Sequence, residues 1–147
     1  MKTIEKVIAF ATLILIVTVS SSVVFAQTDR QTVVNIPFHF TVSDRAMPAG
    51  EYLIRRNRKD ADTVWVIQHK KTGKAVMMLT QAVQANETQE DAKFVFRKYD
   101  DLYILSQFWA AGTNTGREIQ VTDRERELSK SLAKAPQVHV LIARSER

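Results

Sequence analysis

Three histidines are the residues of this chain best suited to metal or acid–base chemistry. They are His39, His69 and His139. Each falls in or at the end of a segment that is expected to be extended, and strands distant in sequence can bring three imidazoles together, as a catalytic zinc site requires. No two of them have the spacing of a ligand pair, and no carboxylate accompanies them in a motif. We therefore interpret them as strand histidines on polar faces and predict no metal site.

Two short motifs match parts of the penicillin-binding enzymes. Residues 71–73 read Lys-Thr-Gly, and Ser131 precedes Lys134 as in the Ser-x-x-Lys motif, whose lysine activates the serine one helical turn away. In those enzymes the serine motif comes first, whereas here it comes second, and the domain is too small. The chain also lacks a glycine-rich phosphate loop, His-Glu-x-x-His and Gly-x-Ser-x-Gly. We therefore predict no catalytic residues, no cofactor and no enzymatic activity.

Basic residues gather at two of the expected turns. They are Lys70, Lys71, Lys74, Arg97 and Lys98. In a simple up-and-down meander these turns share one end of the sheet, so the cations would form a basic rim for an anionic glycan, a lipid head group or nucleic acid. Two aspartates that follow Lys98 dilute the charge, and a solvated surface that keeps the strand ends soluble is the favoured alternative. Nucleic acid is disfavoured because the net charge is only +5.

Four phenylalanines are placed to face the interior. They are Phe38, Phe40, Phe94 and Phe96. Such rings could line a cavity for an apolar ligand, as in small barrels that hold one molecule. The alternative, which is the usual outcome, is a close-packed core with no such space.

The elements that must position these residues begin after a segment typical of a secretory leader. Two lysines precede an apolar run from Val7 to Val19, and three serines break that run shortly before Ala26. We predict that residues 1–26 are a signal peptide, cleaved between Ala26 and Gln27. The alternative is an uncleaved membrane anchor, because no charge occurs from Val7 through Thr28 and about 20 apolar residues span a bilayer.

The chain contains no cysteine, which excludes disulfide bonds, cysteine-ligated zinc, iron–sulfur clusters, thiol catalysis and lipoprotein attachment. A domain of the size left after the leader can bury a core without such cross-links. We therefore predict a protein exported to the periplasm or the extracellular space whose domain is held together by packing alone.

The remaining sequence predicts a series of short strands. From Val34 to Val42 apolar and polar residues alternate, which indicates one strand with one buried face. Further strands are expected over Glu51–Arg56, Thr63–His69, Ala75–Thr80 with an extension to Val83, Phe94–Phe96, Leu102–Trp109 and Val138–Ile142. A turn is expected over Ser43–Gly50, and an exposed loop over Gln84–Asp91. The pattern predicts a mainly β fold, an antiparallel meander that forms a small barrel or sandwich.

The strand expected over Leu102–Trp109 is apolar on both faces. One face would carry Leu102, Ile104 and Phe108, and the other Tyr103, Leu105 and Trp109. A strand that is buried on both sides needs a cover on its outer face. The only candidate cover in the sequence is the segment Asp123–Ala135.

That segment has the features of one short amphipathic helix packed on the sheet. Thr122 and Glu125 have the spacing of a capping box, and Leu128 and Leu132 lie one turn apart among charged residues. Pro136 blocks further helix. We therefore expect a helix over about residues 123–135.

Parts of the chain resemble a known family. Residues 34–42 read Val-Asn-Ile-Pro-Phe-His-Phe-Thr-Val, and residues 47–52 read Met-Pro-Ala-Gly-Glu-Tyr. With Phe94–Tyr99, Tyr103–Leu105 and Gly116–Glu118, they resemble a family of small uncharacterised exported β-rich proteins common in acidobacterial genomes. The resemblance covers most of the chain after the leader, and its distinctive parts are Pro-Phe-x-Phe and Pro-Ala-Gly-x-Tyr. It implies an exported β domain and supplies no catalytic residues.

The predicted organisation is a signal peptide (1–26), a short N-terminal lead (27–31), a single β domain (32–144) and a tail (145–147). The leading functional hypothesis is a non-enzymatic binding or interaction protein of the bacterial cell envelope, whose partner would be an envelope protein or an anionic glycan. Contact with a membrane is expected only if the leader is not cleaved. A small-barrel carrier of an apolar ligand is the first alternative, and an enzyme that depends on a histidine is a weaker one.

Overall fold

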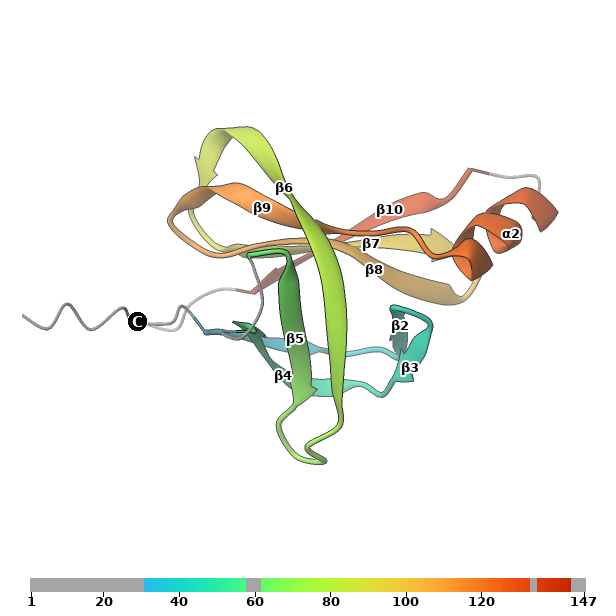
Figure 1. Cartoon of the computed structure of the whole chain (residues 1–147), viewed down its shortest axis with the longest axis horizontal. Helices are drawn as coiled ribbons and strands as arrows, with labels where there is room; N and C mark the ends of the chain where they lie inside the picture. The colour runs from blue at the N-terminus through green and yellow to red at the C-terminus, as the bar shows by residue number, and fades with distance from the viewer. Residues whose placement is uncertain (1–30, 58–61, 133–134, 144–147) are drawn as a thin grey trace, which may run out of the picture.

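The computed structural model describes residues 31–57, 62–132 and 135–143. The predicted signal peptide, its cleavage site at Ala26 and Gln27, and the tail lie outside these residues. The described part of the chain forms ten strands and one short helix (Figure 1). They are β1 (Thr32–Ile36), β2 (Phe40–Val42), β3 (Arg45–Met47), β4 (Gly50–Arg56), β5 (Val64–His69), β6 (Ala75–Gln89), β7 (Ala92–Tyr99), β8 (Leu102–Trp109), β9 (Thr113–Ile119), α2 (Asp123–Ser131) and β10 (Gln137–Ala143).

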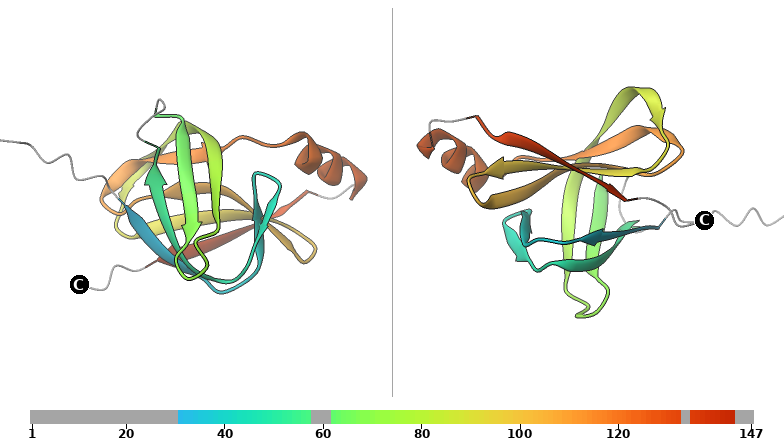
Figure 2. Two further views of the ribbon diagram at one scale, coloured as in Figure 1. Left: turned by 60° about the horizontal axis from the view of Figure 1, so that its bottom comes forward. Right: turned by 180° about the vertical axis from the view of Figure 1, so that it is seen from behind.

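The strands form two sheets that are joined through β6. The strand order is β1-β4-β5-β6-β9-β8-β2-β3, and β7 adds to β8 and carries β10 on its other side. The first half of the 15-residue β6 pairs with β5, and its second half pairs with β9, so the strand runs from one sheet into the other (Figures 1 and 2). All pairings are antiparallel except that of β2 with β8. The strand order does not close into a barrel. The predicted mainly β, antiparallel fold is therefore confirmed in its sandwich form.

The interior is filled by side chains that alternate along the strands, as the period of two predicts. Three of the four inward phenylalanines, Phe40, Phe94 and Phe96, are buried, and Phe38 packs on the core while partly exposed. The Phe40 ring lies edge-on to Tyr52 with centroids 5.2 Å apart and to Phe96 at 5.7 Å. These aromatic contacts join the two sheets into one core.

The segment from Val34 to Val42 is not one strand, as the alternation predicted. Pro37 interrupts it, and while β1 pairs with β4, β2 lies parallel to β8 in the other sheet. The predicted turn Ser43–Gly50 contains β3. A two-residue turn joins β2 to β3, with positive φ at Ser43 (46°) and Asp44 (61°), as the twist of a tight hairpin demands.

The predicted loop Gln84–Asp91 is wrong, because β6 continues to Gln89 and pairs with β9. The sequence did not predict β9 either. Most side chains of this part of β6 are exposed or half-buried, so neither face shows the apolar alternation that marks a half-buried strand. Backbone pairing in this ribbon does not depend on apolar residues.

The bounds predicted for β8 are those observed, but its faces differ from the prediction. Its register with β7 shifts between Val95 and Phe96, which leaves Ser106 as an extra residue in a bulge. The Ser106 hydroxyl donates to the Val95 carbonyl at 2.9 Å. Because of this extra residue, Leu105 and Phe108 both reach the core rather than opposite faces.

Helix α2 ends at Ser131, earlier than the predicted residue 135. Half of the predicted capping box is observed, since the Thr122 hydroxyl accepts from the Glu125 N–H at 3.2 Å, whereas the Glu125 carboxylate binds Arg97. The residue that the helix buries is Glu125, however, and Leu128 is only half-buried. In the described segments, no helix is long and apolar enough to cross a membrane.

Candidate functional site

The three histidines occupy separate structural environments. His39 is exposed between β1 and β2, His69 ends β5, and His139 on β10 lies edge-on to Phe38 and Tyr103 with centroids 5.4 and 5.2 Å away. In the regions that the structure describes, no group of three histidine or acidic side chains could hold a metal ion.

His69 organises the β5–β6 hairpin. Its Nδ1 accepts from the backbone N–H groups of Lys71 and Thr72, each at 3.2 Å, so the ring proton belongs on Nε2. The ring lies edge-on to Tyr52, and its Nε2 lies so close to Gly50 that a Cβ at that position would overlap it. The imidazole is therefore held in place by structural contacts.

The predicted basic rim divides into two separate regions. Lys70, Lys71 and Lys74 lie at the β5–β6 hairpin, at the foot of the first sheet, whereas Arg97 and Lys98 lie at the end of β7 beside α2 (Figures 1 and 2). The expected meander would have placed both turns at one end. Because β6 passes into the second sheet, the two turns point to different corners of the molecule.

At the end of β7, the Arg97 guanidinium is enclosed by carboxylates. Its Nη1 donates to Glu125 Oε1 at 2.7 Å, and its Nη2 lies 3.8 Å from Glu118 Oε1. Gln81 and Gln107 donate to the two oxygens of Glu118 at 2.9 and 3.2 Å. These contacts fasten α2 to β7 and β9 at one end of the sheet, whereas the prediction placed the helix over β8. The sequence identified Arg97 but not its partners, which lie on β9 and α2.

Tyr99 belongs to the same polar cluster. Its hydroxyl lies 3.4 Å from Glu125 Oε1, and burial, followed by the negative charge of Glu125, raises the pKa of this tyrosine. The phenol therefore stays protonated and donates to the carboxylate over the whole physiological range. This cluster stabilises the position of the helix.

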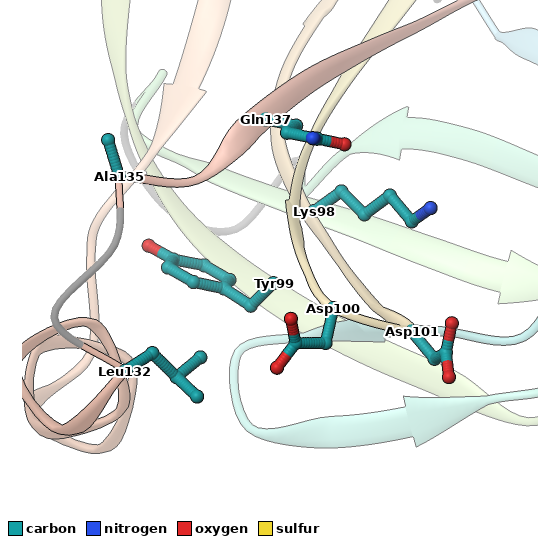
Figure 3. Close-up of a pocket in the computed structure, with 7 residues that line it drawn as sticks. All are labelled: Lys98, Tyr99, Asp100, Asp101, Leu132, Ala135 and Gln137. Carbon is teal, nitrogen blue, oxygen red and sulfur yellow. The ribbon is translucent and has the colours of Figure 1, made fainter.

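A pocket of about 400 Å³ lies between the β7–β8 turn and α2 (Figure 3). Its lining residues are Lys98, Tyr99, Asp100, Asp101, Leu132, Ala135 and Gln137. The Lys98 and Gln137 side chains extend to the side opposite Leu132 (Figure 3), and Lys98 Nζ lies 5.4 Å from the Tyr103 ring centroid. One lysine and two aspartates line this pocket, so it does not present charge of a single sign.

A second groove, of about 530 Å³, lies between β3 and the first half of β6. Its lining residues are Ser43, Arg45, Val66, Lys74, Ala75, Val76 and Met77. They include two cations and no carboxylate. Met77 contributes an apolar side chain that is 65% exposed. We call this site the β3–β6 groove.

The β6 backbone on this groove is an open strand edge. The backbone N–H of Thr80 donates to the Thr63 carbonyl at 2.7 Å, and the Lys74 carbonyl accepts from the His69 N–H at 2.8 Å. The backbone N–H and C=O groups of the even-numbered β6 residues therefore point toward β5. The Leu79 carbonyl instead accepts from Gln120 at 3.0 Å, on the opposite edge.

By this alternation, the N–H and C=O groups of Ala75 and Met77 also point away from β5. Strand β9 pairs only from Thr80 onward. Among the described residues, no strand therefore pairs with the β6 edge at Ala75 and Met77.

The opposite wall of the groove is formed by β3, which within the described segments pairs with β2 alone. Lys74 Nζ donates to the Ala46 carbonyl of β3 at 2.6 Å. A lysine side chain rather than a backbone hydrogen bond connects the two strands here. The groove is thus bounded by two strand edges that do not pair with each other.

The cations of the groove are not neutralised within the described residues. Neither Arg45 nor Lys74 has a carboxylate partner there, and Lys71 on the same hairpin also has none. Lys70 is different, because it forms an ion pair with Glu51 at 2.9 Å. The β3–β6 groove therefore offers positive charge, apolar surface and free backbone groups together.

Sequence reasoning found only Lys74 among the groove residues. Arg45 lay in a predicted turn, and Met77 read as part of a strand. The pattern that could have indicated an exposed site is the run of apolar residues over Ala75–Leu79, which leaves Met77 and Leu79 on the outer face. No protein-family model matches the chain, and comparisons with curated proteins and with solved structures find no match.

Proposed function

We propose that this chain is an exported, non-enzymatic interaction protein of the bacterial cell envelope, and that it binds an envelope protein through the β3–β6 groove. The observation that carries the proposal is the open edge at Ala75 and Met77, which lies beside the uncompensated charges of Arg45 and Lys74. Unpaired strand edges are templates for another chain, and proteins usually cover or blunt them. The leader-like start of the sequence supports export.

The two alternatives have less support. An enzyme that depends on a histidine would need an imidazole free to move a proton, and the Nδ1 of His69 is occupied by two backbone donors. A carrier of an apolar ligand would need space in the core, where Phe40 packs directly against Phe96 and Tyr52. A bound ligand seen by native mass spectrometry would revive the carrier.

Site-specific crosslinking in the host tests the proposed function. A photo-reactive amino acid replaces Met77 in one strain and Val138 in another, since both side chains are strongly exposed (65% and 70%) but lie on β6 and β10. We expect a discrete adduct with an envelope protein from position 77 and none from position 138. The absence of an adduct at 77, or the same adducts from both positions, would contradict the proposal.

Fractionation and N-terminal sequencing test export in the same strains. We expect the mature chain outside the cytoplasm to begin at Gln27. Retention of the full leader on membrane-bound protein would favour the anchor alternative.

A further inference from the structure

We infer that the β3–β6 groove binds an extended, acidic segment of a partner protein, which adds as a strand to the free edge of β6. This inference rests on the proposed function and names the chemistry of the partner. In strand addition, main-chain hydrogen bonds supply affinity, while side chains at alternate positions supply specificity. The groove has features suited to both.

The backbone contribution comes from Ala75 and Met77. Each presents one N–H and one C=O to the open edge, so an added strand can form up to four hydrogen bonds there. Backbone groups of this kind require donors and acceptors at the regular repeat of another extended chain. A lipid surface or a nucleic acid does not supply that repeat, and for this reason the observations favour a polypeptide.

The Lys74 side chain joins the two walls of the groove. Paired strands stand about 4.8 Å apart, but here the Lys74 side chain spans from the start of β6 to the Ala46 carbonyl on β3. An entering strand would displace this ammonium group from the carbonyl. Lys74 would then become available to a carboxylate of the incoming segment.

The preference for an acidic segment follows from the charges of the groove. Arg45 and Lys74 line it, and none of the described residues in its lining is a carboxylate. The nearest described acidic residue along the chain, Asp44, has its carboxylate engaged by the Thr122 hydroxyl at 2.7 Å. Charge-assisted hydrogen bonds from a guanidinium or an ammonium group to a carboxylate are stronger than neutral ones.

Apolar residues of the segment would alternate with the acidic ones. Met77 and Val66 are cross-strand partners on the outer face of β5 and β6, and both line the groove. Alternate side chains of an added strand project to this same face. The segment expected to bind therefore alternates carboxylates with β-branched apolar residues.

Peptide titration of the isotope-labelled exported protein tests this inference. The probes are a blocked seven-residue peptide that alternates glutamate with valine, the same peptide with lysine in place of glutamate, and vesicles of anionic phospholipid. We expect the glutamate peptide to bind at least about tenfold more tightly than the lysine peptide, which corresponds to about 1.4 kcal/mol. Binding should slow hydrogen exchange at the amides of Ala75 and Met77 and leave Val76 and Met78 unchanged.

Charge-reversal variants provide the matched comparison. Arg45→Glu and Lys74→Glu should each weaken the glutamate peptide by about tenfold or more. Lys71→Glu makes the same charge change on the same hairpin outside the groove lining, and it should weaken binding by less than about threefold. Circular dichroism of the three variants should match that of the parent, because all three side chains are exposed.

Several outcomes would overturn the inference. One is that the glutamate peptide does not bind, or that both peptides bind with equal affinity. Another is that binding leaves hydrogen exchange at Ala75 and Met77 unchanged. A third is that the protein binds the vesicles but not the peptide. The crosslinking experiment separates this failure from that of the proposed function. If position 77 still forms its adduct in the Arg45→Glu, Lys74→Glu double variant, the acidic-strand inference fails and the interaction function stands.

Discussion

The end of β7 and the β5–β6 hairpin are both basic, but the two regions use their cations differently. Arg97, which is 20% exposed at its side chain, contacts Glu118 and Glu125. Lys74 at the hairpin is exposed, and among the described residues its ammonium group donates to a backbone carbonyl and to no carboxylate. Arg97 is enclosed within the molecule, whereas Lys74 faces a groove whose described lining residues include no carboxylate.

This difference separates charges that stabilise the fold from charges that are available to a partner. A guanidinium paired with a buried carboxylate is strongly coupled to stability, because removal of either member leaves the other uncompensated. An exposed cation without a carboxylate contributes little to stability. Substitutions in the two regions should therefore change different properties of the protein.

Arg97→Met should produce the largest loss of stability. It leaves the Glu125 carboxylate, which is only 6% exposed, without its cation, and we expect the free energy of unfolding to fall by about 3 kcal/mol. Urea unfolding monitored by circular dichroism measures the loss.

Arg45→Met is the matched control, because it removes the same charged group from an exposed position in the β3–β6 groove. It should change stability by less than about 0.5 kcal/mol. Equal losses from Arg97→Met and Arg45→Met would remove the distinction between the two regions.

Tyr52, next to His69 at the base of the β5–β6 hairpin, should make the protein sensitive to alkali. Its hydroxyl donates to the Pro48 carbonyl, and burial raises its pKa to about 12. Because the folded-state pKa is above the unfolded value of about 10, this stabilisation is fully present below pH 10 and is lost as the pH rises toward and through 12. The expected loss is about 2 kcal/mol by pH 12.

Unfolding measured as a function of pH, with tyrosinate absorbance as a second probe, checks this expectation. Tyr52→Phe should remove this part of the pH dependence at the cost of one hydrogen bond, about 1 kcal/mol at neutral pH. Tyr99 at the end of β7 also has a raised pKa, so Tyr99→Phe should likewise reduce the loss of stability at alkaline pH. If the Tyr52→Phe protein loses as much stability at alkaline pH as the parent, Tyr52 does not cause that loss.

His69→Leu should have a smaller effect, confined to the hairpin that carries the available cations. The substitution removes the acceptor of the Lys71 and Thr72 amides, and we expect a loss of about 1–2 kcal/mol with faster exchange of those two amides. His69→Asn should restore part of the protection, because its Oδ1 can replace Nδ1. His39→Leu is the exposed control and should be neutral.

Local rules predicted the elements whose residues carry their own signal. The bounds of β8 followed from its apolar residues on both faces, and the start of α2 from the spacing of Thr122 and Glu125. Strand β9 and the end of β6 could not be predicted, because neither has an apolar alternation: β6 after Thr80 is exposed or half-buried, and β9 buries only Gly116 and Ile119. The Ser106 bulge was equally hidden, because one extra residue leaves the composition of the strand unchanged.

The candidate site depended on long-range topology and was therefore largely out of reach of the sequence. The groove exists because β2 leaves the first sheet and pairs in parallel with β8, which places Arg45 of β3 opposite Lys74. Glu125 likewise reaches Arg97 across 28 positions of sequence. The sequence shows where the basic side chains are, but only the fold determines whether a carboxylate of the same chain already pairs with them.

Breaking the Lys70–Glu51 ion pair should give the smallest loss of stability. This exposed pair is the opposite extreme to the buried pair of Arg97 and Glu125. The two side chains are about half exposed, and their atoms lie 2.9 Å apart. Because water and salt screen such a pair, Lys70→Met should cost less than about 1 kcal/mol, and added salt should reduce the difference further. Urea unfolding of Lys70→Met and Arg97→Met at low and high ionic strength compares the two losses of stability. A salt-resistant loss as large as that of Arg97→Met would mean that pairing itself, rather than burial of the pair, determines how strongly a cation stabilises this domain.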